Sequence, residues 1–257
     1  MIIGIIHKGS GLGDQLFSYI VTRVRAADLG IDFGFVGKEF FKGASFMNLD
    51  WGKEADLPYQ VEEPTGKVVV VRPLYWGRGL FELNKPYYDP EFNFIPDGSV
   101  IDGYGAQDIR YFEHRLDEVR EWLKVEHLFV HPNICVVNIR GGEFKAVPEL
   151  FLPKSYWDEA MQMMTNKYPE IRFEIHMDDL KLAHDWFPNI VATKDISLNW
   201  RSIRYAKHLI ISNSAFAILP ALLNKNVKEV IAPKFWNRRN LGRWDWPMNY
   251  YKGWDYI

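Results

Sequence analysis

Residues 2–17 read IIGIIHKGSGLGDQLF. The apolar start of this stretch predicts a buried strand, and the glycines of 9–13 predict a tight turn behind it. From Asp14 onward, apolar residues recur at the spacing of one helix face, which predicts a helix that ends at Gly30. Residues 32–36 predict a second strand. This order of strand, turn, helix and strand is typical of an α/β fold.

A regular alternation of strands and helices resumes near residue 101. Strict alternation predicts a parallel sheet covered by helices on both faces. Residues 37–100 are rich in glycine, proline and aromatic residues, which predicts an irregular insertion with one strand at 67–72. The other predicted strands are 134–139, 171–176, 190–192, 209–212 and 229–231, and the other predicted helices are 108–123, 155–167, 179–186, 200–206 and 215–223.

This pattern predicts two Rossmann-like α/β domains that face a cleft. We place the N-terminal domain, with its irregular insertion, at 1–128 and the C-terminal domain at 129–257. The segment around 125–133 is the expected break, because it separates the two stretches of alternation.

Composition excludes several classes of protein. The 257 residues are 47% hydrophobic, and 31 basic against 33 acidic side chains give a net charge of −2. This balance argues against disorder and against a dedicated nucleic-acid binder, which needs a clustered basic excess. A single cysteine, Cys135, excludes an intrachain disulfide framework and a zinc site built from cysteines. No apolar run approaches the roughly 18 residues of a membrane span. We therefore expect a cytoplasmic protein of bacterial or viral type, with peripheral association with a membrane as the alternative.

The glycine turn at 9–13 is the first candidate site. A turn between a strand and a helix start presents N–H groups that suit a phosphate. Gly9, Gly11 and Gly13 with Asp32 partly match the nicotinamide-dinucleotide fingerprint, but Asp14 stands where the last glycine belongs. A dehydrogenase and a simple capped turn both stay open on these residues.

Three further candidate sites follow predicted strands of the second half. Arg140 and Glu143 lie in a glycine-containing loop after the first of them, where arginine suits phosphate oxygens and a carboxylate suits proton transfer. The other two are the pair 178–179 and the trio 212–214. Both could face a nucleotide, and both could equally cap the helices that follow.

Several motifs are absent from the sequence. It holds no D-x-D, no H-E-x-x-H, no G-x-S-x-G and no P-loop motif, and its seven histidines are scattered. These absences argue against a metal-dependent transferase, a zinc peptidase, a serine hydrolase and a P-loop ATPase. We expect no metal and no cofactor.

Five segments resemble the motifs of the alpha-1,2-fucosyltransferases. They stand in the family's order and together cover most of the chain. The segments are SGLGDQLF at 10–17, DGY at 102–104 through YF at 111–112, VNIRGGEF at 137–144, DD at 178–179 and KHLIISNSAF at 207–216. The corresponding family motifs are G-G-L-G-N-Q-M-F, G-Y-x-Q-S-x-K-Y-F, V-H-I-R-R-G-D-Y, S-D-D and K-H-x-I-I-S-N-S-T-F.

The resemblance implies a GT-B-type enzyme that transfers fucose from GDP-fucose to a glycan hydroxyl, with inversion and without a metal. It implies that the C-terminal half holds the nucleotide, that Arg140 grips the diphosphate, and that Ser214 with nearby amides supports it. The implied donor-binding residues are Gly11, Gly13, Asp14, Gln15, Asn138, Arg140, Asp178, Asp179, Ser212, Asn213 and Ser214.

The chain departs from the family at several of these positions. Asn138 replaces a histidine, Gly141 an arginine and Asp14 an asparagine, and Asn199 stands where an acid is usual. Glu143 replaces an aspartate and keeps a carboxylate, so the predicted catalytic residues are Glu143, as base, and Arg140. Because the lost arginine removes a positive charge from the donor site, a transferase of another nucleotide sugar is an alternative.

Two alternatives come from other classes. One is a catalytically silent protein that binds a nucleotide or glycan, and the other is an NAD-dependent oxidoreductase that uses the glycine turn. The expected partners are a nucleotide sugar and an oligosaccharide acceptor, with no nucleic acid and no transmembrane segment. Residues 235–256 are rich in aromatic side chains, which predicts either part of an acceptor cleft or a tail that packs on the other domain.

Overall fold

The computed structural model describes residues 1–56, 80–83, 88–239, 243–247 and 251–257. The chain divides into two compact units, Met1–Lys124 and Val125–Ile257. Each is an α/β unit with its own parallel sheet, so the α/β class expected from the alternation is confirmed. The observed division falls four residues before the predicted boundary.

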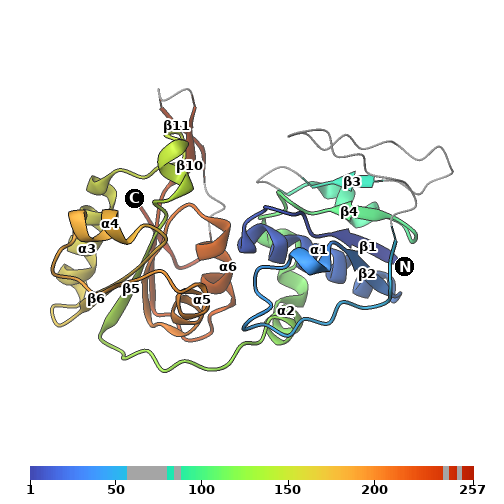
Figure 1. Cartoon of the computed structure of the whole chain (residues 1–257), viewed down its shortest axis with the longest axis horizontal. Coiled ribbons are helices and arrows are strands. Elements are labelled where there is room, and N and C mark those ends of the chain that lie inside the picture. The colour runs from blue at the N-terminus through green and yellow to red at the C-terminus, as the bar shows by residue number, and fades with distance from the viewer. Residues whose placement is uncertain (57–79, 84–87, 240–242, 248–250) are drawn as a thin grey trace. The chain divides into compact units, whose positions relative to one another are not determined.

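The first unit is built on a four-stranded parallel sheet in the order β2-β1-β4-β3. Its first helix, α1, connects β1 to β2, as the opening stretch predicts (Figure 1). Gly30 ends α1 in the left-handed conformation, at φ +66°, which favours glycine. The elements are β1 (Ile2–Ile5), α1 (Leu12–Leu29), β2 (Phe33–Val36), β3 (Leu80–Glu82), β4 (Val100–Asp102) and α2 (Leu116–Trp122), with short 3-10 turns at Lys38–Phe40, Pro90–Phe94, Ile109–Tyr111 and Glu113–Arg115.

The second unit is built on a six-stranded sheet in the order β12-β9-β8-β5-β6-β7, and every pair is parallel. Helices α3 and α4 lie on one side of this sheet, and α5 and α6 lie on the other (Figure 1). A separate antiparallel hairpin joins β10 to β11. The elements are β5 (Ile134–Ile139), α3 (Lys154–Lys167), β6 (Arg172–Met177), α4 (Leu180–Trp186), β7 (Ala192–Thr193), α5 (Ile196–Tyr205), β8 (His208–Ile210), α6 (Ala215–Leu223), β9 (Glu229–Ala232), β10 (Phe235–Arg239), β11 (Arg243–Pro247) and β12 (Asp255–Tyr256), with a 3-10 turn at Glu143–Ala146.

The six parallel strands follow the strand order 3-2-1-4-5-6 when numbered along the unit. This is the order of the dinucleotide-binding Rossmann sheet. The chain leaves β5 toward β6 on one side and later returns to β8 on the other, so the switch point lies between β5 and β8. Ligands of such sheets bind at the carboxyl ends of the strands on either side of that point.

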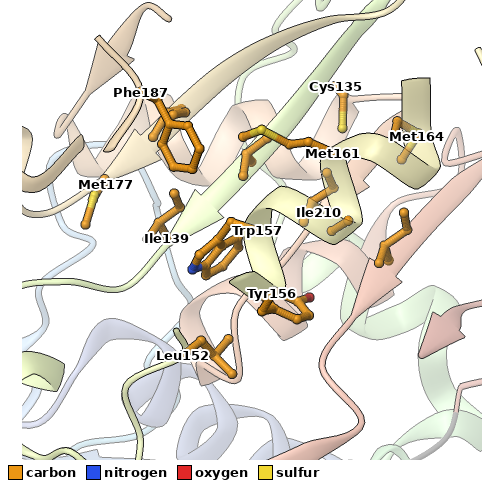
Figure 2. Close-up of a cluster of buried hydrophobic side chains, with 14 of the residues drawn as sticks. Cys135, Ile139, Leu152, Tyr156, Trp157, Met161, Met164, Met177, Phe187 and Ile210 are labelled. Carbon is orange, nitrogen blue, oxygen red and sulfur yellow. The ribbon is translucent and has the colours of Figure 1, made fainter. Parts of the chain in front are cut away.

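A buried apolar cluster holds α3 against the sheet of the second unit. Figure 2 shows Trp157 and Met161 of α3 among side chains from β5, β6 and β8. Each such side chain contributes about 1.5–3 kcal/mol when it leaves water completely. The Tyr156 hydroxyl in the same cluster donates to the Ile211 carbonyl at 2.8 Å, which satisfies its one buried polar group. This bond fixes the end of β8 relative to α3.

Two predicted helices differ from the observed elements. The predicted helix 108–123 is two 3-10 turns followed by α2, because Phe112 has φ −143° and ψ 1° and interrupts the helical path. Helix α5 begins at Ile196, earlier than predicted, since Asp195 caps it by accepting from the Leu198 amide. The predicted strand 67–72 lies outside the described residues.

The end of the chain joins the sheet of its own unit. Strand β12 pairs with β9, and the Lys234 amide donates to the Ile257 carbonyl at 2.8 Å. Tyr251 is buried. Among the described residues, no helix is long and apolar enough to cross a membrane.

Candidate functional site

The first group of predicted site residues lies at the carboxyl edge of the second sheet, around its switch point. Arg140 follows β5 directly, and the trio 212–214 connects β8 to α6. The parallel pairing of β5 with β8 brings these two loops to the same edge. The structure therefore brings together residues that are about 70 positions apart in the sequence.

Arg140 is held by two carboxylates. Its guanidinium lies 2.5 Å from Glu143 Oε1 and 2.9 Å from Asp178 Oδ2. Its Nε is buried and has no hydrogen-bond partner in the part of the chain that the structure describes. A charged donor group with an unused buried N–H is suited to an anionic ligand, because arginine presents five N–H groups in a fixed fork.

Asp178 organises the loop that carries Arg140. Its Oδ1 accepts from the amides of Gly141 and Gly142 at 2.8 and 3.1 Å, and its Oδ2 pairs with Arg140. A Cβ at position 141 would lie 2.4 Å from the end of the Met177 side chain and 3.1 Å from the Asp179 Cβ. The glycine at 141, where the related motif has an arginine, thus matches the tight packing of this loop.

Asp179 has the capping role that its position allowed. Its Oδ1 accepts from the Leu182 amide at 3.0 Å at the start of α4, and its Oδ2 pairs with Lys145. The hydrogen bond from Lys145 is the main cause that lowers the pKa of Asp179 below its usual value. Capping is therefore confirmed for Asp179, while contact of either aspartate with a nucleoside stays a prediction.

The trio 212–214 is almost completely buried. Ser214 caps α6 by accepting from the Phe216 amide at 3.3 Å. The Asn213 amide group donates to the carbonyls of Leu150 and Trp236, but its Oδ1 is buried without a partner among the described residues. The unpaired oxygen and the first N–H groups of α6 offer an acceptor and donors at this edge.

A buried polar chain lies behind the switch point. The Ser212 hydroxyl donates to Asn138 Oδ1 at 3.2 Å, and Asn138 Nδ2 lies 3.5 Å from the His176 carbonyl. His176 Nδ1 lies 2.7 Å from Asn199 Oδ1, which connects β6 to α5. His176 is fully buried, and sequence reasoning gave it no role. The departures Asn138 and Asn199 are thus both members of one hydrogen-bonded network.

The second group of predicted site residues lies in the first unit, between β1 and α1. Gly11 precedes α1 in an extended conformation, and Gly13 is buried in its first turn. Asp14 Oδ1 accepts from Gln107 Nε2 at 2.9 Å. This loop leaves the carboxyl end of β1, so it lies at the carboxyl edge of the first sheet.

Gln15 is a buried clamp rather than an exposed side chain. Its amide donates to the carbonyls of His7 and Phe40 at 3.3 and 2.9 Å, and its oxygen accepts from the Lys42 amide at 2.9 Å. Only 1% of Gln15 is exposed. These hydrogen bonds connect the start of the glycine turn to the backbone at residues 40 and 42. Contact of Gln15 with a donor stays a prediction.

Comparison with known proteins gives matches to solved structures only. No protein-family model and no curated protein sequence matches the chain. A crystal structure of NodZ alpha-1,6-fucosyltransferase soaked with GDP-fucose is 13% identical, with a TM-score of 0.42, and the match covers 89% of this chain and 93% of that one. The fucosyltransferase NodZ from Bradyrhizobium is 14% identical, with a TM-score of 0.44, over 89% and 94% of the two chains.

Proposed function

We propose that this chain is a glycosyltransferase of the GT-B type that transfers fucose from GDP-fucose to a hydroxyl group of a glycan, with alpha-1,2 linkage as the resemblance implies. The observation that carries this proposal is the edge at the switch point, where Arg140 Nε and Asn213 Oδ1 are buried polar atoms without partners in the described chain. The five family-like segments support the same conclusion, because three of them supply this edge.

The site can stabilise a departing diphosphate. Negative charge grows on the phosphate oxygens as the bond to the sugar breaks, and fixed N–H groups and cations aimed at that charge lower the barrier. Arg140 supplies a cation, and the start of α6 supplies N–H groups with the positive end of the helix dipole. We infer from this donor set that transfer proceeds without a metal.

Glu143 lies next to Arg140, the residue proposed to bind the diphosphate. It lies in the 3-10 turn after Arg140, and its side chain is 72% exposed while it pairs with the guanidinium. A carboxylate there can orient Arg140, and it is the sequence-derived candidate for the base. Inversion requires a base on the face of the sugar opposite the leaving group, because the acceptor oxygen attacks from that side.

A thermal-shift panel tests the donor. We expect GDP and GDP-fucose, without added metal, to raise the unfolding midpoint by about 5–10 °C when present at about one hundred times Kd. UDP, CMP and NAD are the comparison ligands. A shift with UDP alone would change the donor, and a shift with NAD alone would overturn the transferase proposal.

A transfer assay completes the test. Radiolabelled GDP-fucose with a panel of oligosaccharide acceptors should give labelled oligosaccharide. Binding of GDP with no transfer to any acceptor and no donor hydrolysis would identify a silent binding protein instead.

A further inference from the structure

Two carboxylates occupy the guanidinium of Arg140, and they take different donor groups. Asp178 Oδ2 pairs with Nη1 at 2.9 Å, and Glu143 Oε1 pairs with Nη2 at 2.5 Å. The remaining donor, Nε, is buried and has no partner among the described residues. Because Nε and Nη2 form one side of the arginine fork, a phosphate that binds there through both N–H groups meets the Glu143 carboxylate.

The Asp178 carboxylate is fixed by the folded chain. Its other oxygen accepts from the amides of Gly141 and Gly142 at 2.8 and 3.1 Å. A ligand that displaced Asp178 from the guanidinium would also have to disturb the loop that these hydrogen bonds organise. Asp178 is therefore a lasting partner of Arg140.

The Glu143 carboxylate is held by the arginine alone. Its side chain is 72% exposed, and it has no second hydrogen bond or ion pair in the part of the chain that the structure describes. An exposed ion pair is weak, because water solvates both charges well. The turn that carries Glu143 is closed by its backbone, where the Lys145 amide donates to the Gly141 carbonyl at 2.8 Å. A change of rotamer, which exposed side chains make within nanoseconds, is enough to release the carboxylate.

Arg140 keeps its orientation when Glu143 leaves. The Phe144 ring lies against the guanidinium, with Cζ 5.1 Å from the ring centroid, and Asp178 holds Nη1. The first contact is a cation–π attraction and the second is an ion pair. Neither involves Glu143, so its carboxylate contributes negative charge to the edge and is not needed to orient the cation.

Negative charge exceeds positive charge around this loop. Arg140 and Lys145 form ion pairs with Glu143, Asp178 and Asp179, which leaves one carboxylate unbalanced. The related motif has a second arginine directly after the first, and this chain has a glycine there. A diphosphate is itself anionic, so the excess carboxylate opposes its binding.

We propose that Glu143 is an exchangeable counter-ion that limits the affinity of the donor site for nucleoside diphosphates. This role deepens the proposed function and rests on it. When the donor binds, a phosphate oxygen takes the place of Glu143 at Nη2 of Arg140, and the carboxylate turns toward solvent. When the nucleoside diphosphate leaves after transfer, the carboxylate returns and balances the charge of the arginine. The exchange thereby speeds product release.

The test measures GDP binding to the full chain by isothermal titration calorimetry. Glu143→Gln keeps the size of the side chain and removes its charge. The affinity for GDP should rise about 3–10-fold, the scale of a weak ion pair together with the repulsion of one nearby carboxylate. Stopped-flow displacement should show that GDP dissociates more slowly by a similar factor, because affinity differences at one site are expressed mainly in the dissociation rate. Weaker binding would show that Glu143 orients Arg140 or contacts the ligand, and would overturn the exchange.

Glu170→Gln is the matched control for the loss of one negative charge. Glu170 is exposed in the turn before β6, at the opposite edge of the same sheet. The strand separates it from the site by roughly 20 Å at about 3.3 Å per residue. This distance exceeds the Debye length of about 10 Å at 0.1 M salt, so GDP affinity should change by no more than about twofold.

Arg140→Ala provides a second control. In this background Glu143 has no guanidinium to occupy, so the added Glu143→Gln change should raise GDP affinity by no more than about twofold, from the residual repulsion alone. An equal gain in both backgrounds would reveal a general effect of charge and overturn the exchange.

The remaining outcomes separate this role from the proposed function. If wild type binds GDP and Glu143→Gln binds it no more tightly, the exchange is overturned and the transferase function stands. A loss of fucose transfer at unchanged GDP affinity would identify Glu143 as a base and overturn the counter-ion role. If wild type binds neither GDP nor GDP-fucose, the donor site fails and the exchange fails with it.

Discussion

The Ser212 hydroxyl donates a hydrogen bond to Asn138 Oδ1 at 3.2 Å, and both side chains are at most 2% exposed. The bond joins the ends of β8 and β5 across the switch point of the second sheet. It makes the position of the α6 start depend on the position of the Arg140 loop.

Ser212→Ala should lower the free energy of unfolding by about 1–3 kcal/mol, because it leaves the buried Asn138 oxygen without its donor. Urea denaturation of the purified protein measures this loss. Ser155→Ala, an exposed serine in the first turn of α3, is the control and should change stability by no more than about 0.5 kcal/mol. Equal stability of both variants would contradict the prediction.

Gln15→Ala should cost about 2–4 kcal/mol, since it removes three hydrogen bonds to backbone groups and leaves a small cavity. The same denaturation experiment applies. Gln162→Ala, on the exposed face of α3, provides the comparison and should be nearly neutral. If the two variants unfold at the same urea concentration, the clamp contributes nothing.

Arg140→Ala should weaken GDP binding by about 2–3 kcal/mol, or about 30–150-fold, as expected for a charge-assisted contact. Isothermal titration calorimetry gives the affinity directly. Arg172→Ala is a suitable control, because Arg172 is exposed at the amino end of β6, on the opposite edge of the sheet. An unchanged affinity in a folded Arg140 variant would remove this residue from the donor site.

Prolonged treatment with EDTA should leave the rate of fucose transfer unchanged. The physical reason is that Arg140 and the N–H groups at the start of α6 already supply positive charge to the diphosphate. The measurement is turnover before and after chelation, followed by addition of Mg²⁺ or Mn²⁺. A loss of activity that a divalent ion restores would show that the protein cation is insufficient.

The stability contributed by His7 should depend on pH. Its folded-state pKa is raised, mainly by the hydrogen bond with Asp102. The contribution is therefore fully present below the unfolded pKa of about 6.5 and is lost as pH rises through the folded-state pKa. The difference in unfolding free energy between wild type and His7→Gln should be larger at acidic than at alkaline pH, and a flat difference would contradict the raised pKa.

The sequence predicts the kind of fold but not its strand order. Alternation identifies β5, β6, β8 and β9 because each is a short apolar run between helical segments. It carries no information on which strands are neighbours, so the 3-2-1-4-5-6 order and its switch point emerge only from the pairing. The sequence also does not predict the break in the helix at Phe112, because the backbone conformation there is imposed by tertiary packing and not by local propensity.

The candidate site likewise contains residues that a local sequence pattern predicts and contacts that only the folded chain creates. Arg140 and the 212–214 trio were predicted because polar residues at strand ends are a local signal. His7 and Asp102 are 95 residues apart, and His176 and Asn199 are 23 apart, so their contacts depend on folding. The available signal for His7 was its place after the first predicted strand, and Asp102 stands where the alternation resumes, within a motif already considered.

Each of the two parallel sheets is made from one unbroken segment of chain, and the described strands pair only within their own unit. The peptide bond between Lys124 and Val125 is therefore a suitable crossover point at which one unit can be exchanged between related proteins. Under the proposed function, recognition of the departing diphosphate is encoded after this point. A chimaera that replaces residues 125–257 with the matching half of a homologous transferase should therefore bind the nucleotide of that homologue.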